Sequence, residues 1–453
     1  MSHTTTHYDV IVIGAGPAGQ HCAARLAEGG VRVAIVEREL VGGECDYWAC
    51  IPSKTLLRPG EALEEAHEAP GAREAVGGAL DSPAAFEWRD FMVSNYDDTA
   101  KVGWLEESGI DVLRGAARIA GPGRVVVGGD ERGAEDIVLA TGSDPVIPPI
   151  PGLAEADGVW TNREATALTE VPRRLLVLGG GPVGVEMGQA VRRMGASVAL
   201  VEGQDHLLPR EPAALGQALG RALASDGIEL CFGEHASAVR REDGEYVLEF
   251  PDRDELRGDR LLVATGRRPR TEGLGLETVG IEPTRRGVEV DSQMRAGERV
   301  WAIGDVTGIW PLTYVGKYQG RVAAANILGG RREASYEAVP RVVFTDPQAA
   351  SVGDGDGAHT GTVPVSGVPR TATYTREYAE SPGFMTLVSD GERLTGAYAL
   401  GPEAGEWLQQ ATVAIRAWVP LEIMYDVIQP FPTFSEIFLN ALLELAAEAP
   451  AAA

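Results

Sequence analysis

The fold is decided by the stretch YDVIVIGAGPAGQHCAARLAEGGVRVAIVE, residues 8–37. It reads as an apolar strand, a glycine turn, a helix and a second apolar strand that ends at Glu37. The turn carries the pattern Gly-x-Gly-x-x-Gly at Gly14, Gly16 and Gly19. These glycines permit a tight turn and let a pyrophosphate approach the helix N-terminus, where unpaired N–H groups and the helix dipole favour negative charge. Because Glu37 is placed to accept hydrogen bonds from a ribose, the stretch predicts a dinucleotide-binding module.

The pattern then repeats in RRLLVLGGGPVGVEMGQAVRRMGASVALVE, residues 173–202. The second copy has its glycines at Gly179, Gly181 and Gly184 and ends at Glu202. In both copies the acid lies 23 positions after the first glycine. Two such modules in one chain imply two dinucleotides, and the economical pair is a flavin and a nicotinamide.

The rest of the chain divides into segments that differ in composition and in the pattern of apolar residues. A short buried strand broken by Thr-Gly occurs twice, in IVLATGSDP at 137–145 and in LLVATGRRP at 261–269. Residues 58–110 alternate Ala/Glu-rich helical stretches with Gly and Pro breaks, and the proline-rich segment 145–152 is typical of a domain crossing. From about residue 336, short alternating strands followed by a helical stretch predict a separate α+β domain.

Length and charge exclude several classes of protein. With 453 residues we expect two or three domains. A formal charge of −26 argues against a nucleic-acid partner, since phosphate would be repelled. The sequence has no apolar run of the roughly 18–20 residues that a membrane span needs, and its start has no signal-peptide pattern. Four cysteines are too few for a disulfide scaffold, so we expect a reducing cytoplasm.

Two of the cysteines lie in GGECDYWACIPSK, residues 42–54, directly after the first ribose acid. Cys45 and Cys50 could form half of a zinc site only with two further ligands, and the sequence has no second cysteine pair and no histidine cluster to supply them. Cys22 and Cys231 lie within apolar runs and are predicted to be core residues. The pair in the loop therefore indicates a dithiol/disulfide couple that can take two electrons from a reduced flavin, with no metal site.

With these motifs the chain resembles the FAD-dependent pyridine nucleotide–disulfide oxidoreductases, the family of dihydrolipoamide dehydrogenase, glutathione reductase and mercuric reductase. The match runs nearly end to end and includes CIPSK, both ATG strands, VWAIGDV at 300–306, VVFTDP at 342–347 and PTFSE at 432–436. It implies an α/β fold with two Rossmann-like domains and a C-terminal α+β dimerisation domain. The expected segments are 1–150 and 271–335 for the two parts of the FAD-binding domain, 151–270 for the NAD(P)H-binding domain and 336–453 for the dimerisation domain.

The resemblance also implies roles for single residues. Cys50 would face the flavin as a charge-transfer thiolate, Cys45 would exchange with the substrate, and Lys54 would lie near the flavin ring and pair with Glu186. Residues implied to hold FAD are Gly14, Gly16, Gly19, Glu37 and Asp305. Residues implied to hold the nicotinamide dinucleotide are Gly179, Gly181, Gly184 and Glu202. Further cofactor-binding positions are Gly43, Thr141, Gly142, Gly266 and Gly304.

Glu202 also bears on the choice of nicotinamide. A carboxylate at the strand end accepts the 2′-hydroxyl of NADH and repels the 2′-phosphate of NADPH. The following segment GQDHLL, residues 203–208, offers no arginine pair for a phosphate. We therefore expect NADH to be preferred over NADPH.

The sequence departs from the family near its C-terminus. Disulfide reductases carry His-Pro-Thr-x-x-Glu there, which reaches into the partner subunit's site, whereas this chain has Phe431 in place of the histidine and keeps Glu436 as a candidate catalytic residue. General acid–base catalysis contributes about 10²–10⁴ in rate, so a lipoamide- or glutathione-type reaction would lose that help. Mercuric reductases also lack the histidine, but they add a C-terminal cysteine pair, and this chain has no cysteine after Cys231.

Tyr47 and Trp48 are a second departure, because relatives have small or aliphatic residues between the two cysteines. They either reshape the thiol face, with the Tyr47 hydroxyl near Cys45, or pack against neighbouring helices.

The sequence as a whole predicts a homodimeric, cytoplasmic FAD enzyme whose C-terminal segment completes the partner's site. Electrons would pass from NADH through FAD and the Cys45–Cys50 disulfide to a small-molecule acceptor that needs no histidine. Two alternatives of the same class are a quinone- or dye-type diaphorase and a reductase of an unusual disulfide or a thiol-bound metal ion. An alternative of another class is a flavin-bearing redox sensor with little turnover.

Overall fold

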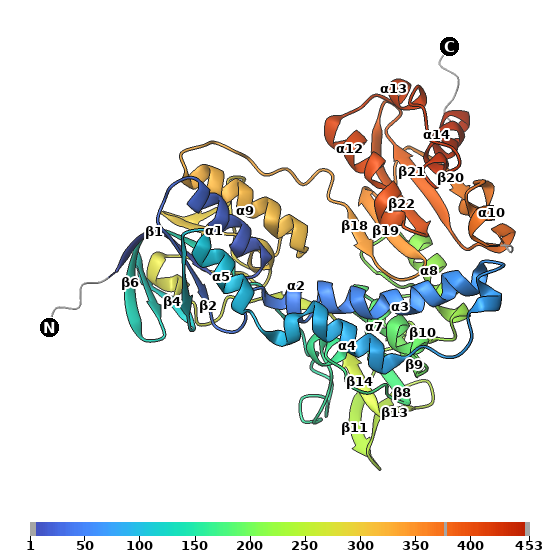
Figure 1. Ribbon diagram of the computed structural model, residues 1–453, viewed down its shortest axis with the longest axis horizontal. Helices are drawn as coiled ribbons and strands as arrows, with labels where there is room; N and C mark the ends of the chain where they lie inside the picture. Colours follow the sequence, from blue (N-terminus) through green and yellow to red (C-terminus); the bar gives the residue numbers. More distant parts are fainter. Residues whose placement is uncertain (1–5, 376–377, 449–453) are drawn as a thin grey trace. The chain divides into compact units, whose positions relative to one another are not determined.

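A computed structural model describes residues 6–375 and 378–448, and its contacts divide the chain into two compact units (Figure 1). The first unit contains the described residues up to Pro52 together with Arg89–Val146 and Gly266–Ser335. The second unit contains Ser53–Trp88, Ile147–Thr265 and the described residues from Tyr336 onward. The long helix α3 (Cys50–Glu68) begins in the first unit and continues in the second.

An eight-stranded sheet forms the centre of the first unit. Six of its strands follow the order β16-β17-β6-β1-β2-β3, and β5 joins β6 with β4 beside it. The strands are β1 (His7–Ile13), β2 (Val33–Glu37), β3 (Ile110–Arg114), β4 (Ala117–Gly121), β5 (Arg124–Val127), β6 (Asp130–Leu139), β16 (Arg295–Gly297) and β17 (Val300–Ala302). The four neighbouring pairs from β17 to β3 are parallel, and the apolar run 10–13 is buried on both faces, as expected for a central parallel strand.

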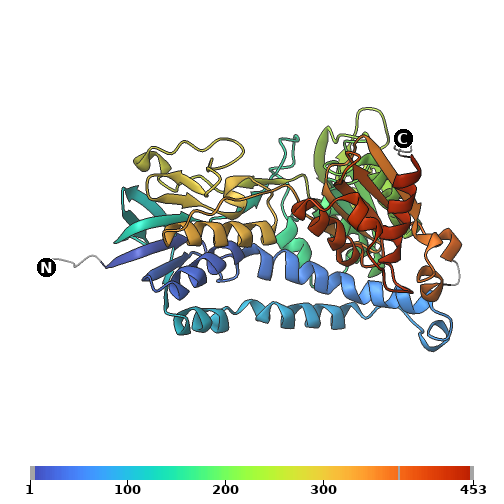
Figure 2. The ribbon, with the colours of Figure 1, turned by 90° about the horizontal axis from the view of Figure 1, so that it is seen from above.

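Two helices of the first unit, α1 (Pro17–Glu28) and α9 (Thr313–Ile327), lie side by side in both views (Figures 1 and 2). Gly320 permits this approach, because a Cβ there would lie 2.9 Å from the carbonyl oxygen of Ala18. Shorter elements complete the unit: α2 (Gly43–Tyr47), α5 (Thr99–Glu107), and the antiparallel pair β7 (Ser143–Pro145) and β15 (Arg267–Pro269).

The second unit contains a four-stranded parallel sheet in the order β10-β9-β8-β14. Its strands are β8 (Arg174–Leu178), β9 (Ser197–Glu202), β10 (Glu229–Phe232) and β14 (Arg260–Val263), and its helices are α6 (Asn162–Thr166), α7 (Pro182–Arg193) and α8 (Ala213–Ser225). A small antiparallel sheet is made of β11 (Ala238–Glu242), β12 (Glu245–Glu249) and β13 (Leu256–Gly258). This part repeats the strand–helix–strand order of the first unit, as the duplicated motif predicts.

The C-terminal part of the second unit is a five-stranded antiparallel sheet in the order β18-β19-β22-β21-β20. Its strands are β18 (Arg341–Val343), β19 (Gln348–Gly353), β20 (His359–Pro364), β21 (Phe384–Ser389) and β22 (Leu394–Gly401). Its helices are α10 (Thr371–Tyr374), α11 (Ala404–Trp407), α12 (Gln409–Ala417), α13 (Leu421–Tyr425) and α14 (Glu436–Glu448). Figure 1 shows α14 beside β20, where Gly361 leaves room for the helix backbone.

The predicted fold class is confirmed, with two parallel sheets of the Rossmann kind and a C-terminal α+β part. The helical reading of 58–110 also agrees with α3, α4 (Ser82–Met92) and α5. Leu56 and Leu57 of α3 and Phe86 of α4 join a hydrophobic core of the second unit. Compact units can group several domains, so the domain boundaries expected from the sequence stay predictions; their outermost residues, 1–5 and 449–453, lie outside the described part of the chain. None of the helices in the described residues is long and apolar enough to cross a membrane.

Candidate functional site

The first glycine turn joins β1 to α1 and is packed so closely that only glycine fits at two positions. Gly14 has φ +109°, and a Cβ there would lie 2.3 Å from the carbonyl oxygen of Ala140. A Cβ on Gly19 would lie 2.0 Å from the carbonyl oxygen of Gly14. Gly16 differs, because no atom lies within 4 Å of a Cβ built there. The middle glycine therefore faces open space at the start of α1, which has no side-chain cap.

The second glycine turn, between β8 and α7, repeats this arrangement. Cβ atoms on Gly179 and Gly184 would lie 2.5 Å from the carbonyl oxygen of Ala264 and 2.0 Å from that of Gly179. Gly181 again faces open space, at a helix start that has no side-chain cap. Both turns thus leave room for a ligand at a helix start without a side-chain cap, and both fit the pyrophosphate of a dinucleotide.

The two ribose acids are held in the same way at the ends of β2 and β9. Each carboxylate accepts one N–H from the glycine turn and one N–H from the residue two positions after the acid. The bonds are Ala15 N to Glu37 Oε2 (2.9 Å), Glu39 N to Glu37 Oε1 (2.9 Å), Gly180 N to Glu202 Oε2 (2.7 Å) and Gln204 N to Glu202 Oε1 (2.9 Å). The carboxylates are therefore fixed beside the turns where the motif predicts them.

Other predicted positions lie around the first turn. A Cβ on Gly43 would lie 3.0 Å from the Cα of Gly16, and a Cβ on Gly304 would lie 3.2 Å from the Cβ of Ala18. Gly304 donates its N–H to Gln319 Oε1 at 2.6 Å. The structure thus brings Gly43 to Gly16 in the turn and Gly304 to Ala18 at the start of α1.

Asp305 has a partner that the sequence reading missed. Ser143 donates its hydroxyl to Asp305 Oδ2 at 2.6 Å, and Arg267 Nε donates to Ser143 Oγ at 2.8 Å. Ser143 directly follows the first ATG motif and is buried. A buried serine at that place in the motif was the signal available in the sequence.

Thr141, Gly142 and Gly266 lie beside the pair β7–β15. Gly142 and Gly266 directly precede these two strands, and the Thr141 hydroxyl donates to the carbonyl oxygen of Arg270 at 2.7 Å. In this structure the Thr141 side chain therefore makes a hydrogen bond within the protein.

The two loop cysteines lie next to each other as thiols and are not joined by a disulfide. Cys45 lies on α2 and Cys50 is the first residue of α3. Cys50 Sγ is 3.3 Å from the hydroxyl oxygen of Thr313, the first residue of α9. The pKa of Cys45 is raised, mainly by its hydrogen bond to Cys50 and then by burial. The two sulfurs are therefore close enough to interact directly, and Thr313 lies beside them. Cys22 and Cys231 are buried, as predicted for core residues.

Tyr47 fills the space beneath this loop. Its side chain is 0% exposed, and its hydroxyl donates to the carbonyl oxygen of Val41 at 3.1 Å. Its ring packs against Trp48 and Tyr96, with centroid distances of 5.7 and 6.3 Å. Burial raises the pKa of Tyr47 to about 12. Of the two interpretations of Tyr47 and Trp48, these contacts favour packing.

The predicted pair of Lys54 and Glu186 is present in the second unit. Lys54 Nζ lies 2.6 Å from Glu186 Oε2, and the other carboxylate oxygen accepts the N–H of Phe344 at 2.9 Å. The ammonium group also lies 4.7 Å from the centre of the Phe344 ring. Glu186 is thus a buried carboxylate with partners on both oxygens, which is the condition for keeping such a charge in the interior.

The C-terminal segment exposes apolar side chains next to a buried carboxylate. Phe431 is 72% exposed and Ile428 is 94% exposed. Glu436, at the start of α14, has a buried Oε2 for which the described residues provide no hydrogen-bond partner. An unpaired buried acceptor is costly, so this carboxylate is open to a donor from outside the described chain.

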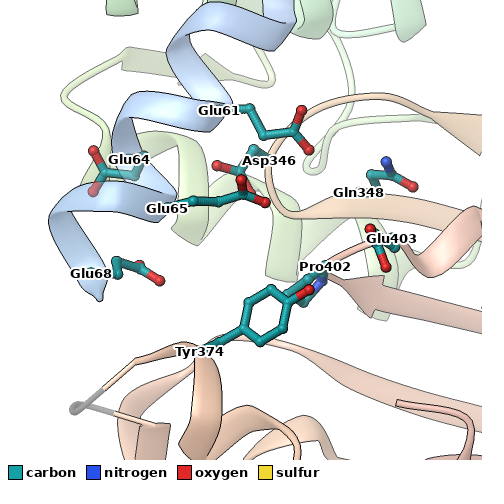
Figure 3. Close-up of a pocket in the computed structure, with 9 residues that line it drawn as sticks. All are labelled: Glu61, Glu64, Glu65, Glu68, Asp346, Gln348, Tyr374, Pro402 and Glu403. Carbon is teal, nitrogen blue, oxygen red and sulfur yellow. The ribbon is translucent and has the colours of Figure 1, made fainter. Parts of the chain in front are cut away.

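An acidic pocket lies in the second unit (Figure 3). Its lining residues are Glu61, Glu64, Glu65, Glu68, Asp346, Gln348, Tyr374, Pro402 and Glu403. Asp346 pairs with Arg193 at 2.7 Å, while burial raises the pKa of Asp346. Within residues 6–375 and 378–448, no group of His, Cys, Asp and Glu side chains is arranged to hold a metal ion. The pocket therefore gives no support for a metal centre.

Comparisons with known proteins agree with this geometry. The family model described as pyridine nucleotide-disulphide oxidoreductase matches residues 8–320, and the model of the dimerisation domain of that family matches residues 339–442. A dihydrolipoyl dehydrogenase of Thermus scotoductus is 36% identical over 96% of each chain. A mercuric reductase of Acidithiobacillus ferrooxidans is 35% identical, over 94% of this chain and 80% of its own.

A solved structure extends the likeness to the fold. It is a Cu(II) complex of the HOCl-induced flavoprotein disulfide reductase RclA from Escherichia coli, with a TM-score of 0.85 and 27% identity over 98% of this chain and 100% of its own. Two family models together match most of the chain, and relatives above 30% identity are matched nearly end to end. The chain therefore belongs to the pyridine nucleotide–disulphide oxidoreductase family and is an NAD(P)H-dependent flavoprotein oxidoreductase.

Proposed function

We propose that this protein is a homodimeric FAD enzyme that takes electrons from NADH and passes them through Cys45 and Cys50 to an acceptor reduced without an imidazole acid–base. The observation that carries the proposal is the pairing of a contacting thiol couple with a phenylalanine, Phe431, at the place of the family histidine. Phenylalanine can pack against an acceptor but cannot exchange a proton, so the preferred acceptor is one whose reduction needs no proton at that position.

Support for FAD comes from the first unit. Its open glycine turn, the fixed carboxylate of Glu37 and the Ser143-supported Asp305 suit the pyrophosphate, the ribose and the ribityl chain. When bound, FAD supplies a flavin that accepts a hydride from the nicotinamide and gives two electrons to the disulfide. Cys50, at the start of α3, is the sulfur that we assign to the flavin side, and Cys45 is the sulfur that we assign to the acceptor.

Support for NADH comes from Glu202. Both of its oxygens accept backbone N–H groups, so the carboxylate is held at the end of β9 and is not free to swing away. A fixed negative charge there accepts a 2′-hydroxyl and repels a 2′-phosphate. We expect the ratio kcat/KM to be higher for NADH than for NADPH.

For the acceptor we favour a thiophilic metal ion held by the two sulfurs. Cysteine thiolates are soft ligands that suit copper and related metals, and capture of such an ion by a contacting sulfur pair needs no general acid. Two similar proteins are named for a metal ion: the relatives include mercuric reductases, and RclA was solved as a Cu(II) complex. The competing possibility, a quinone reduced at the flavin itself, would not use the thiols.

The C-terminal part supports a dimer, since residues 339–442 match the family's dimerisation domain. We propose that 336–453 form the dimer interface and that Phe431 and Glu436 reach the site of the partner. The exposed apolar side chains of Phe431 and Ile428 and the unpaired oxygen of Glu436 suit burial against a second copy.

The test is an anaerobic NADH titration of the holoenzyme followed by turnover with mercuric ion, cupric ion, lipoamide, glutathione disulfide and a quinone. We expect metal-ion reduction that is lost in both Cys45→Ser and Cys50→Ser. Lipoamide turnover should be about 10²–10⁴-fold below that of a dedicated lipoamide dehydrogenase assayed alongside, the range expected when a general acid–base is missing.

Each part of the proposal has an outcome that contradicts it. Lipoamide turnover equal to that of the dedicated enzyme would mean that another group moves the proton. Quinone turnover that survives Cys45→Ser, without metal-ion reduction, would make the protein a diaphorase. Negligible NADH consumption with every acceptor would favour the redox sensor. Phe431→His should raise lipoamide turnover, and His21→Gln on the exposed face of α1 serves as the matched control.

A further inference from the structure

The short helix that carries Cys45 has little stability of its own. α2 has five residues, and its N-cap residue Gly42 supplies no side-chain hydrogen bond. Helices of this length are unstable in isolation, because few hydrogen bonds offset the cost of ordering the backbone. The position of Cys45 relative to Cys50 therefore depends on contacts that other elements of the first unit make with α2.

Helix α5 makes two such contacts. Asp98 is the N-cap residue of α5, yet its carboxylate does not cap that helix and instead accepts the N–H of Val41 at 2.6 Å. One turn later, Lys101 Nζ lies 2.5 Å from Asp46 Oδ2. Asp98 and Lys101 are three positions apart and therefore lie on the same face of the helix. This face of α5 holds both the segment that leads into α2 and α2 itself.

The place of Lys101 is not explained by α5 alone. Lys101 is one of only three lysines in the chain, and it lies in the first turn of α5, where the helix dipole disfavours a positive charge. Its ammonium group lies 5.9 Å from the centre of the Tyr47 ring, within the range of a cation–π contact. Both partners of Lys101, Asp46 and Tyr47, belong to α2. The contacts of this lysine thus serve the cysteine loop.

We propose that Lys101 is a positioning residue that holds Cys45 beside Cys50 by fixing Asp46 on α2. The inference rests on the proposed function, in which the two cysteines alternate between dithiol and disulfide. Two sulfurs that are held next to each other close to a disulfide more readily than two free thiols, because the entropy of bringing them together is already lost. Acting through Asp46, Lys101 therefore stabilises the oxidised form of the pair.

The test measures the equilibrium between the cysteine pair and dithiothreitol in the FAD-loaded protein, at one fixed pH. Two electrons pass from dithiothreitol to the Cys45–Cys50 bond, which breaks while dithiothreitol closes to its ring disulfide. The two protons that dithiothreitol loses go to the released sulfurs and the buffer. The reduced fraction is read by mass spectrometry after acid quenching and alkylation. The readout is the ratio of reduced to oxidised dithiothreitol that gives half-reduction.

Lys101→Met should make the disulfide easier to reduce. The ratio at half-reduction should fall about tenfold, less than the roughly hundredfold that a displacement of about 1 Å can cost. A tenfold change corresponds to about 30 mV for a two-electron couple. The effect is limited because Glu44, 3.8 Å from Arg267, still holds α2 on the other side of Cys45. Lys101→Arg keeps the charge and should give the ratio of the wild type.

Asp46→Asn separates positioning from a direct effect of charge. Since it breaks the same ion pair, it should shift the ratio in the same direction as Lys101→Met, and the double variant should shift it no further. If the charges alone acted on the sulfurs, the two variants would shift the ratio in opposite directions, because they remove charges of opposite sign. Arg25→Met is the matched control, since it removes an exposed ion pair with Glu28 on α1 and should leave the ratio unchanged.

The outcomes separate the two proposals. A wild-type protein in which Cys45 and Cys50 form no reversible disulfide would overturn the proposed function. A reversible disulfide whose ratio is the same in wild type, Lys101→Met and Asp46→Asn would overturn the role of Lys101 alone, and so would opposite shifts in the two variants. Should Lys101→Met fold poorly, as judged by FAD content and unfolding temperature, Asp46→Asn decides the question, because it breaks the same ion pair with almost no change in side-chain size.

Discussion

The two glycine modules have nearly the same backbone and quite different side chains. In both, a returning loop donates an N–H to the same carbonyl of the turn: Gly42 to Ala15 and Leu208 to Gly180, each at 2.9 Å. The seventh residue after the first glycine, however, is exposed His21 in the first module and Glu186, only 5% exposed, in the second. The backbone of the glycine turn is thus repeated in the two modules, whereas the side chains around it differ.

The candidate functional side chains also lie at a different place in each module. In the first, it follows the ribose acid, where the chain enters α2 and α3 and presents Cys45 and Cys50. In the second, it lies on the helix itself, where Glu186 and Gln189 bind the backbone N–H groups of Phe344 and Asp346. The two modules therefore share a backbone, but the first leads into the cysteine pair and the second carries the Lys54–Glu186 ion pair.

The comparison is tested most strongly at the third glycine of each turn. A Cβ at Gly19 or at Gly184 would lie 2.0 Å from a backbone oxygen, so Gly19→Ala and Gly184→Ala must each move a strand or a helix. We expect Gly19→Ala to weaken FAD binding at least about 100-fold, because a pre-formed anion site is lost. The purified variant should therefore contain less FAD per chain. Gly184→Ala should keep its FAD and lose reduction by NADH.

The measurement is FAD per chain after purification, followed by stopped-flow reduction by NADH. Gly16→Ala and Gly181→Ala are matched variants with free space for the new methyl group, so they should leave the unfolding temperature unchanged and affect only ligand binding. Equal loss of FAD in Gly19→Ala and Gly184→Ala would contradict the assignment of one dinucleotide to each module.

The helix of the second module provides the next largest effect. Among the described residues, Lys54→Met would leave the buried Glu186 carboxylate with the N–H of Phe344 as its remaining partner. Because the Lys54 side chain is 35% exposed, we expect a loss of about 2–3 kcal/mol in the free energy of unfolding, less than for a fully buried pair. Adding Glu186→Gln should restore part of this loss in a double-mutant cycle.

The control for this cycle comes from the corresponding position of the first module. His21→Gln should change the free energy of unfolding by less than about 0.5 kcal/mol, as for other exposed substitutions. A stability for Lys54→Met equal to that of the wild type in urea unfolding would mean that Glu186 finds another donor.

Much of this arrangement could be predicted from local sequence. The glycine turns, the terminal acids and the cysteine loop are short-range patterns whose geometry is set within about 30 residues, and each lies where the pattern predicts. The pairing of Lys54 with Glu186 was also anticipated, but from the family resemblance and not from spacing.

Contacts between distant segments could not be predicted from local sequence. Thr313 reaches Cys50 across 263 positions, and Ser143 reaches Asp305 across 162. Thr313 carries no charge and lies in no glycine motif, and the place of Ser143 directly after the ATG motif does not indicate which distant residue it binds. Their contacts follow only from the packing of α9 and β7, which the period of apolar residues does not specify.

A smaller effect on activity is expected for substitutions of Glu37 and Glu202, which we propose bind different dinucleotides. If Glu202 sets the proposed NADH preference, Glu202→Ala should lower the ratio of kcat/KM for NADH over NADPH about tenfold, the effect of losing one charged hydrogen bond to the ribose. Glu37→Ala should leave this ratio unchanged and weaken FAD binding instead. Steady-state kinetics with both nucleotides, on protein saturated with FAD, measures the ratio. A ratio that falls equally in both variants would remove the distinction between the modules.

The smallest effect concerns the loop that leaves the first module and has no counterpart in the second. Tyr47→Phe removes one buried hydrogen bond, to Val41, and should cost about 1 kcal/mol at pH 8. Because folding raises the pKa of Tyr47 from 10.0 to about 12, the folded state favours the neutral phenol. Its contribution is fully present below pH 10 and is lost as the pH rises toward 12.

The stability gap between wild type and Tyr47→Phe should therefore close above pH 10 and then reverse, since phenylalanine has no proton to lose. A pKa difference of two units corresponds to about 2.7 kcal/mol of folding free energy. This is more than the hydrogen bond of Tyr47 contributes, so the wild type should become the less stable protein at high pH. Urea unfolding of both proteins between pH 8 and the alkaline limit of the fold measures the gap. A gap that stays constant over this range would show that Tyr47 ionises as freely in the folded chain as in the unfolded one, and the loop around Cys45 would then be wetter than its packing against Trp48 and Tyr96 implies.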